Sequence, residues 1–296
     1  MSLSLVVLTV IALSACGKKG SDRFAQETAP AISDMVESSL NTIGGAGDDA
    51  SNETVSATST RSKLETMLAE AFLPKDAWAA SCTRTLSGSA GTCTRDVNCE
   101  WGPYTWGGQV ALTFSNGTSC LNPSIANPGD YFTRTANFSI AGPRGSIATI
   151  SSAHENYLGE TISGGSKVTR QGDGSLAVDV LGVSKVLKLT GQTDPLMDVS
   201  FKTAQPLTMN QLRRNGRVVT GGSLVIQHNR ARYSATHTYS AITWGEAGCC
   251  YPTSGTIDIA FSEGAEGSAQ VVFNGCGSFS VTSGENSASF SLANCE

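Results

Sequence analysis

The chain has 296 residues, of which 25 are acidic and 20 basic, so its formal net charge is -5. This mild negative charge argues against a nucleic-acid-binding protein, which typically carries a basic surface that neutralises phosphate. Charged residues make up 15% of the chain and 32 residues are glycine, a composition typical of an exported β protein rich in turns. The length allows one large β domain or two smaller ones.

The amino terminus has the pattern of an export signal. An apolar run from Leu3 to Leu13 is interrupted at Ser4 and Thr9. It is shorter than the roughly 20 residues that span a bilayer, but it fits the apolar core of a signal peptide. The run ends in Leu13-Ser14-Ala15-Cys16, which resembles the lipobox of bacterial lipoproteins. The first five residues lack the Lys or Arg with which such signals usually open.

The lipobox resemblance covers residues 1–16 and implies a compartment for the whole chain. It implies that residues 1–15 are removed, that acyl chains such as palmitate modify Cys16, and that residues 16–30 form a flexible tether. Gly17, where an Asp would favour retention in the inner membrane, implies lipid anchoring in the outer membrane. The body would then face the periplasm or the cell surface.

Residues 31–80 are predicted to form two short helices with a linker. Ile32, Met35, Val36, Leu40 and Ile43 recur at helical spacing and stop at two glycines. A second helix is predicted to begin at the capping box of Ser62 and Glu65, with Leu64, Met67, Leu68, Ala71 and Phe72 on its apolar side. The pattern leaves open whether these helices pack on the β body or on each other.

Eight further cysteines follow Cys16 and support an oxidising compartment. They fall into two groups of four, which are Cys82, Cys93, Cys99 and Cys120, then Cys249, Cys250, Cys276 and Cys295. An even number in an exported chain indicates up to four disulfides, with two bonds within each group as the simplest arrangement. Zinc is the rival interpretation, but there is no Cys-x-x-Cys motif, and the histidines lie outside both groups.

From residue 81 onward the pattern predicts an all-β body, an antiparallel meander closed as a barrel or folded as a sandwich. It could divide into subdomains 81–155 and 156–296. Apolar and polar residues alternate in short runs separated by turn residues such as Asp173-Gly174 and Asn215-Gly216. The predicted strands are 109–114, 131–140, 146–150, 176–181, 186–189, 197–201, 217–219, 224–226, 232–239, 257–261, 269–273, 278–281 and 288–292.

No catalytic motif stands out. The chain has no Gly-x-Ser-x-Gly elbow, no His-Glu-x-x-His helix and no phosphate-binding loop ending in Gly-Lys-Ser/Thr. A glycosidase-type carboxylate pair would form only in the folded state, and five residues are candidates by type alone. They are Asp179, Asp194, Asp198, Asp258 and Glu263. Sequence therefore predicts neither a catalytic residue nor a cofactor nor a metal.

Two local features are more distinctive. Adjacent strand residues point to opposite faces, so the vicinal Cys249 and Cys250 are predicted to bond separately to Cys276 and Cys295 and to staple the last strands. Trp101, Tyr104 and Trp106 cluster in a Gly/Pro-rich stretch beside Cys99. They form a candidate surface for a glycan or protein partner, although packing over a disulfide is the favoured interpretation.

Basic residues between 199 and 245 are predicted to form two separate, mostly solvated tips rather than one patch. Residues 213–217 flank one turn and residues 228–232 flank the next, so an intervening strand separates them.

The sequence favours a lipid-anchored envelope protein with a noncatalytic binding or structural role. Its membrane contact would be the amino-terminal lipid, and its partner a glycan, a lipid or an envelope protein. Two alternatives stay open. One is a polysaccharide hydrolase with two carboxylates about 5 to 10 Å apart. The other is a barrel that carries a small apolar molecule.

Overall fold

A computed structural model describes residues 81–291, apart from residues 102–103, 119–123, 143–146, 190, 213–214, 246–248 and 250. For residues 81–84, 86, 101, 104 and 106 the backbone alone is described. Cys16 and the two helices predicted within residues 31–80 lie outside the described residues.

Every strand pairing in the described chain is antiparallel, which confirms the all-β prediction. The strands are β1 (Ser81–Ser89), β2 (Thr92–Trp101), β3 (Tyr104–Phe114), β4 (Tyr131–Ala141), β5 (Ile147–Ser151), β6 (Ala153–Glu155), β7 (Thr161–Ser163), β8 (Gly165–Arg170), β9 (Leu176–Lys188), β10 (Met197–Met209), β11 (Val218–His228), β12 (Tyr233–Trp244), β13 (Pro252–Ser262), β14 (Ser268–Gly275), β15 (Ser278–Ser283) and β16 (Asn286–Ser291).

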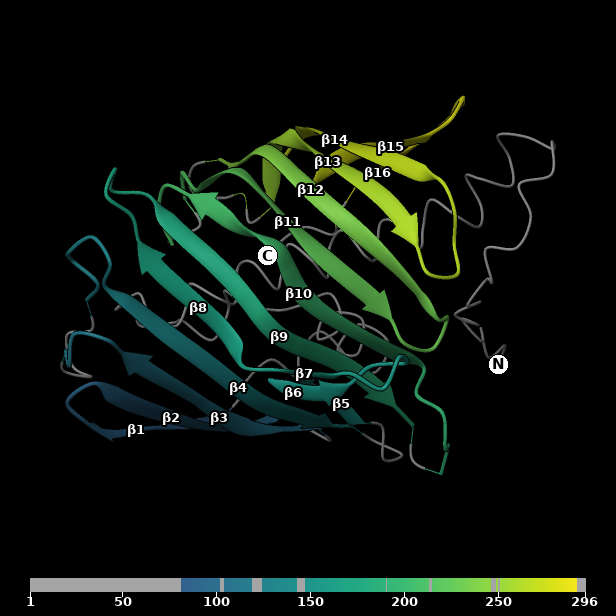
Figure 1. The fold of residues 1–296 in the computed structure, drawn as a ribbon. Helices are drawn as coiled ribbons and strands as arrows, with labels where there is room; N and C mark the ends of the chain where they lie inside the picture. The colour runs from purple at the N-terminus through teal and green to yellow at the C-terminus, as the bar shows by residue number, and fades with distance from the viewer. Residues whose placement is uncertain are drawn as a thin grey trace.

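Fourteen of these strands form one sheet, in the order β1-β2-β3-β4-β5-β9-β10-β11-β12-β13-β14-β15-β16. β8 pairs with both β4 and β9, so β5 and β8 share the space between those two long strands. β6 and β7 form a separate hairpin that lies across β9 (Figure 1).

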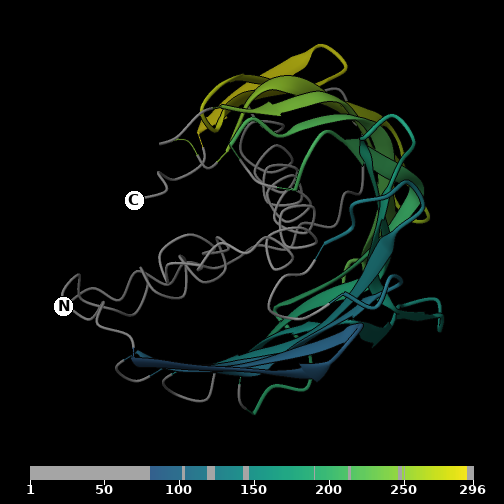
Figure 2. The same cartoon turned by 90° about the vertical axis from the view of Figure 1, so that its left-hand side faces the viewer.

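The sheet is strongly curled, and its first and last strands do not meet (Figure 2). In the described chain β1 pairs with β2 alone and β16 with β15 alone, so the sheet is not closed. Among the described strands there is also no second large sheet that faces it. Neither of the two predicted closures, barrel or sandwich, is found among the described strands. The alternating pattern identifies strands, but it carries no information about how a sheet curls.

One face of this sheet, called here the core face, carries a continuous apolar cluster that extends from Cys93 in β2 to Val281 in β15. The register places Phe201, Ile226 and Ala235 directly across β10, β11 and β12, and none of them is exposed. A curled sheet brings together the side chains of its concave side, so the core face is the concave one. Burying each large apolar side chain contributes about 1.5 to 3 kcal/mol.

Two predicted strand pairs are in fact single strands. Residues 176–181 and 186–189 both belong to β9, and residues 217–219 and 224–226 belong largely to β11. In β9 a bulge next to Gly182 shifts the alternation by one residue, so Val180 and Val183 both pack on the core face. The break in the pattern therefore marks a bulge and not a turn. The prediction also missed β1, β2 and the short strands β6 to β8.

Candidate functional site: a polar clasp on the outer face

A row of polar residues crosses the face opposite the core, called here the outer face. Residues directly opposite each other in neighbouring strands share a face. Seven residues are in register from β4 to β13, and they are Asn137, Ser151, Ser184, Ser200, Gln227, Ser234 and Ser262. The four in the middle of the row are buried, with exposed fractions of 1 to 3%. Buried polar side chains need partners, and the β6–β7 hairpin supplies several of them.

The hairpin approaches the sheet closely at two points. Before β6, the Ser152 hydroxyl accepts a hydrogen bond from the backbone N–H of Ala136 (2.7 Å) and donates to its carbonyl oxygen (3.1 Å). At the end of β7, the backbone of Ser163 lies against Gly182. A Cβ atom at Gly182 would be 2.4 Å from the Ser163 nitrogen, so this approach requires glycine.

Three hairpin residues then reach successive strands of the sheet. His154 Nε2 lies 2.9 Å from Asp198 Oδ1 of β10. The Asn156 amide donates to Gln227 Oε1 of β11 (2.9 Å). Tyr157 reaches the Ser234 hydroxyl of β12 (3.3 Å).

Asn229 and Glu263, which directly follow the ends of β11 and β13, complete the arrangement. The Tyr157 hydroxyl donates to Glu263 Oε2 in the β13–β14 turn (2.9 Å), and the Tyr157 N–H donates to Asn229 Oδ1 (3.1 Å). We call this network the clasp. Its residues are His154, Asn156, Tyr157, Asp198, Gln227, Asn229, Ser234 and Glu263.

Glu263 is the carboxylate of the clasp that accepts hydrogen bonds from two hydroxyl groups. Its Oε2 atom accepts from Ser234 (2.6 Å) as well as from Tyr157. These two hydrogen bonds hold the pKa of Glu263 below its ordinary value, so the carboxylate stays ionised. Glu263 also has a φ of 54°, a left-handed conformation that non-glycine residues rarely adopt. The sheet therefore keeps a strained backbone where this carboxylate meets two hydroxyl groups.

A second carboxylate, Glu160, lies on the other side of Tyr157. It accepts from the Asn156 amide (3.0 Å) and lies 3.6 Å from the Lys202 ammonium group. Burial first, and then the two carboxylates, raise the pKa of the Tyr157 hydroxyl, so it is a proton donor and not a nucleophile at neutral pH.

The clasp contains residue types used in hydrolysis, but its contacts are structural. Nucleophilic catalysis needs a hydroxyl bonded to a base. The Ser200 hydroxyl accepts from Asn229 (2.9 Å), and Asn229 also donates to Asp198 (2.6 Å). His154 meets Asp198 at an ion-pair distance, while its Nε2 atom makes no hydrogen bond. The clasp ties a hairpin to three strands and to the β13–β14 turn, and it shows no activated nucleophile.

Two of the five carboxylates considered from sequence belong to the clasp, where they contact different residues. Asp198 contacts His154 and Asn229, and Glu263 contacts Tyr157 and Ser234. Asp179 accepts from Thr203, Asp258 accepts from Gln270 (2.8 Å), and Asp194 is exposed before β10. The hairpin residues of the clasp had no sequence signal, because β6 and β7 have three residues each and lack an apolar alternation.

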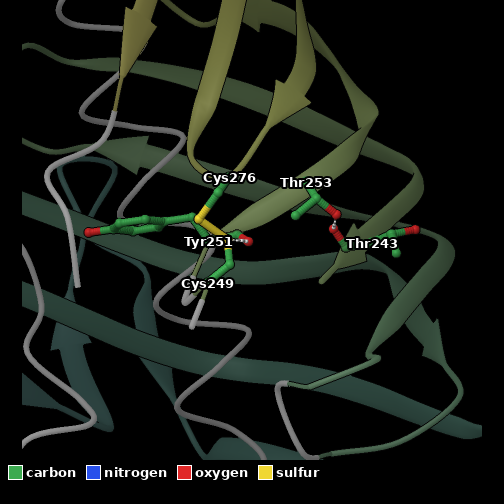
Figure 3. Close-up of a disulfide and its surroundings, with 5 residues drawn as sticks. All are labelled: Thr243, Cys249, Tyr251, Thr253 and Cys276. Atoms are coloured by element: carbon green, nitrogen blue, oxygen red, sulfur yellow. Dashed lines mark hydrogen bonds between the residues drawn. A yellow bond between two sulfur atoms is a disulfide. The ribbon is translucent and has the colours of Figure 1, made fainter. Parts of the chain in front are cut away.

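Among the cysteines, Cys249 and Cys276 form a disulfide with a Cα–Cα distance of 5.7 Å (Figure 3). The bond joins the segment before β13 to the β14–β15 turn, as one of the pairings predicted for the vicinal cysteines. Tyr251, which packs partly on the core, and Thr253, which donates to the Thr243 carbonyl (3.1 Å), lie beside it. Cys93 and Cys99 in β2 are also disulfide-bonded. Cys82 lies opposite Cys99 in the β1–β2 register. Cys120, Cys250 and Cys295 lie outside the described residues.

The three residues of the aromatic cluster lie at the paired ends of β2 and β3. Trp101 is the last residue of β2 and pairs with Tyr104, the first residue of β3, while Trp106 pairs with Cys99. The backbone register places Trp106 beside a disulfide-bonded cysteine, and the packing of the three rings over a disulfide stays a prediction.

One basic residue departs from prediction. Arg217, expected on a solvated tip, is 1% exposed, and its guanidinium lies 5.4 Å from the centre of the Trp244 ring. Stacking on an aromatic ring accommodates a buried guanidinium better than it would an ammonium group.

His237 is the unusual polar residue of the core face. It lies on β12 between Leu224 of β11 and Ile259 of β13, with Ala235 and Tyr239 two residues away on the same face. Its side chain is fully buried, and neither ring nitrogen makes a hydrogen bond. Burial lowers the pKa of His237 to about 3, so the imidazole is neutral at neutral pH.

No His, Cys, Asp and Glu side chains of the described residues gather in a group of three that could hold a metal ion. The same part of the chain has no helix that is long and apolar enough to cross a membrane. No protein-family model, curated protein or solved structure matches this chain.

Proposed function

We propose that this chain is a lipid-anchored protein of the bacterial cell envelope whose β body binds a partner and catalyses no reaction. The observation that carries the second part is the clasp. His154 contacts Asp198 there, and Glu263 accepts from Tyr157 and Ser234, and these contacts hold the hairpin on the sheet. The carboxyl groups of Asp130, Asp173 and Glu263 have pKa values lowered by hydrogen bonds, which is opposite to what a general acid requires.

The anchor rests on the lipobox-like Leu13-Ser14-Ala15-Cys16 and on the disulfides of the body, which form in exported proteins. The test is the intact mass of the full chain purified from its native membrane. Cleavage before Cys16 with added acyl chains is expected for the wild type, and an unprocessed, unmodified mass for Cys16→Ser. An unmodified wild-type mass would refute the anchor.

Outer-membrane placement rests on Gly17. Separation of the two membranes on a density gradient should place the wild type in the outer-membrane fraction. A Gly17→Asp variant with the same lipid should move to the inner membrane. Wild-type protein in the inner-membrane fraction would refute this placement.

The hydrolase alternative is tested by incubating the full chain with envelope glycan and measuring new reducing ends. We expect none above the rate of a heat-inactivated sample. Release that is abolished in both Asp198→Asn and Glu263→Gln variants would overturn the noncatalytic assignment and make the clasp an active site.

The carrying of an apolar molecule is a second candidate, and the extent of the core face favours it. That face is apolar from β2 to β15 of a curled sheet. Its residues are buried, with Phe201, Leu224 and Ile226 0% exposed, so a carrier would have to open before its ligand could enter. Mass spectrometry of an organic extract of the native protein tests this candidate, since a carrier yields stoichiometric lipid in addition to the anchor. An extract that contains anchor lipid alone would refute it.

A further inference from the structure

The core face is buried although it belongs to a single sheet. Its side chains are no more than 1% exposed from Phe132 in β4, through Phe201 in β10, to Val271 in β14. In the described chain every strand except β6 and β7 belongs to this sheet, and that hairpin packs on the outer face. The apolar face of a sheet becomes buried when another layer packs against it. A layer therefore covers the core face, and the described strands do not provide it.

The curl of the sheet does not bury this face without help. In closed barrels, about eight strands leave an interior that their own side chains fill, and larger barrels leave additional space. This sheet has 14 strands and stays open in the described chain (Figure 2). At about 4.8 Å between neighbouring strands, a sheet of this size is roughly 60 Å wide. Side chains of the core face alone cannot fill a curl of that width.

The amino-terminal part of the chain is long enough to supply the missing layer. After residue 81, the stretches outside the described residues are at most five residues long, whereas 80 residues precede β1. Residues 31–80 contain both apolar stripes at helical spacing, one from Ile32 to Ile43 and one from Leu64 to Phe72. Short amphipathic helices are marginal in water and gain most of their stability by packing their apolar side on a surface.

We propose that residues 31–80 form the second layer of the β body, with the apolar sides of two helices packed on the core face. The dimensions agree with this arrangement. Each predicted helix of about 13 residues would be about 20 Å long. The central strands β9 and β11 have 13 and 11 residues. Strands of that size are about 35 to 45 Å long, so each helix fits within the length of the sheet.

This second layer goes beyond the proposed binding role and would control access to the core face. A small apolar molecule could reach Phe201 or Leu224 only after residues 31–80 had moved away. The layer therefore acts against the carrier candidate, while the anchor and the noncatalytic role do not depend on it.

Cross-linking within the folded full chain tests which surface the segment contacts. Photo-leucine has nearly the size of leucine and replaces it throughout the chain during expression. After irradiation and digestion, mass spectrometry should find peptides of residues 31–80 joined to Leu207 and Leu224 of the core face. Leu181, which is 42% exposed and follows the core-face residue Val180 in β9, is the matched control and should not be joined to them.

The same experiment identifies other covers. Absence of cross-links from residues 31–80 to Leu207 and Leu224 would overturn the proposal, and so would links that join the two predicted helices only to each other. A mixture of isotopically labelled and unlabelled chains distinguishes contacts within one chain from contacts between copies. Links found only between copies would assign the cover to a second molecule and would also overturn the proposal.

A pair of alanine variants measures what the contact contributes. Leu68→Ala shortens an apolar side chain of the second predicted helix, and Thr66→Ala changes the opposite side of that helix. Alanine has the highest helix propensity, so a loss of stability must come from lost packing. In urea unfolding of the full chain, followed by the circular dichroism of the β-sheet, Leu68→Ala should lower the ratio of folded to unfolded protein at least tenfold, equivalent to about 1.4 kcal/mol. Thr66→Ala should not lower it. Unchanged unfolding of the sheet in Leu68→Ala would refute the second layer.

Discussion

Acid should destabilise this protein through His237. In the unfolded chain the imidazole titrates near its ordinary pKa of 6.5, whereas burial lowers its pKa in the folded protein to about 3. The unfolded state therefore binds a proton more readily. The folded state loses stability as the pH falls below about 6.5, and the loss continues until about pH 3.

The magnitude follows from the two pKa values. Each unit between the pH and the ordinary pKa contributes about 1.4 kcal/mol, as long as the folded form stays neutral. At about pH 5 the free energy of unfolding should thus be about 2 kcal/mol lower than at about pH 8 because of this residue alone. Groups such as His228, whose pKa burial also lowers, add to the total loss, so a difference between variants is needed.

The measurement is urea unfolding of the full chain, without reductant, at about pH 8 and about pH 5. His237→Leu should be more stable than the wild type at both values, because it removes an unpaired polar group of similar volume. It should also lose about 2 kcal/mol less than the wild type on acidification. Ser166→Ala, which removes a buried hydroxyl that does not titrate, should keep the wild-type acid loss. Equal acid losses in wild type and His237→Leu would refute the buried, neutral imidazole.

Other features give sharp expectations for the same unfolding assay. Tyr157→Phe removes the hydroxyl that donates to Glu263 and should cost about 1 to 2 kcal/mol, while Tyr131→Phe, at an exposed tyrosine, should cost nothing measurable. A Tyr157→Phe cost that persists undiminished in a Glu263→Ala background, which removes the acceptor, would contradict the clasp. Gly182→Ala should destabilise by more than 2 kcal/mol because its Cβ would collide with the Ser163 backbone, whereas Gly172→Ala meets open space and should be neutral. Equal effects of the two glycine variants would contradict the close approach of the hairpin. The paired change Cys249→Ser with Cys276→Ser opens a bridge across a sequence separation of 27 and should cost about 3.5 kcal/mol. A cost near zero would show that the bridge does not constrain the unfolded chain.

The sequence predicted the central strands well because each buries one face. In β13, Ile257 and Ile259 alternate with exposed Asp258 and Ala260, so a period of two is visible. Prediction failed where the backbone breaks that period. Gly182 and the adjacent bulge in β9 reverse the faces within one strand, and a pattern read from residue types interprets this reversal as two strands.

The clasp could not be predicted for a different reason. Its hydrogen bonds join residues far apart in the chain, with a sequence separation of 71 for Asn156 and Gln227 and of 106 for Tyr157 and Glu263. Asn, Tyr and Glu are common in surface loops, so neither their type nor their spacing identifies them. The curl of the sheet and the crossing of the hairpin decide which of these residues meet.

The two faces of the sheet differ in how their buried polar groups are paired. On the outer face the buried side chains of Gln227 and Ser234 make hydrogen bonds, and within the clasp His154 Nε2 is the exception. On the core face the side chains of Ser166 and His237 are buried and have no hydrogen-bond partner. Of these two residues, the imidazole alone gains a proton as the pH falls, so its cost grows in acid. We therefore expect His237 to limit the stability of the core face in acid, and the clasp to hold the hairpin on the outer face of the sheet.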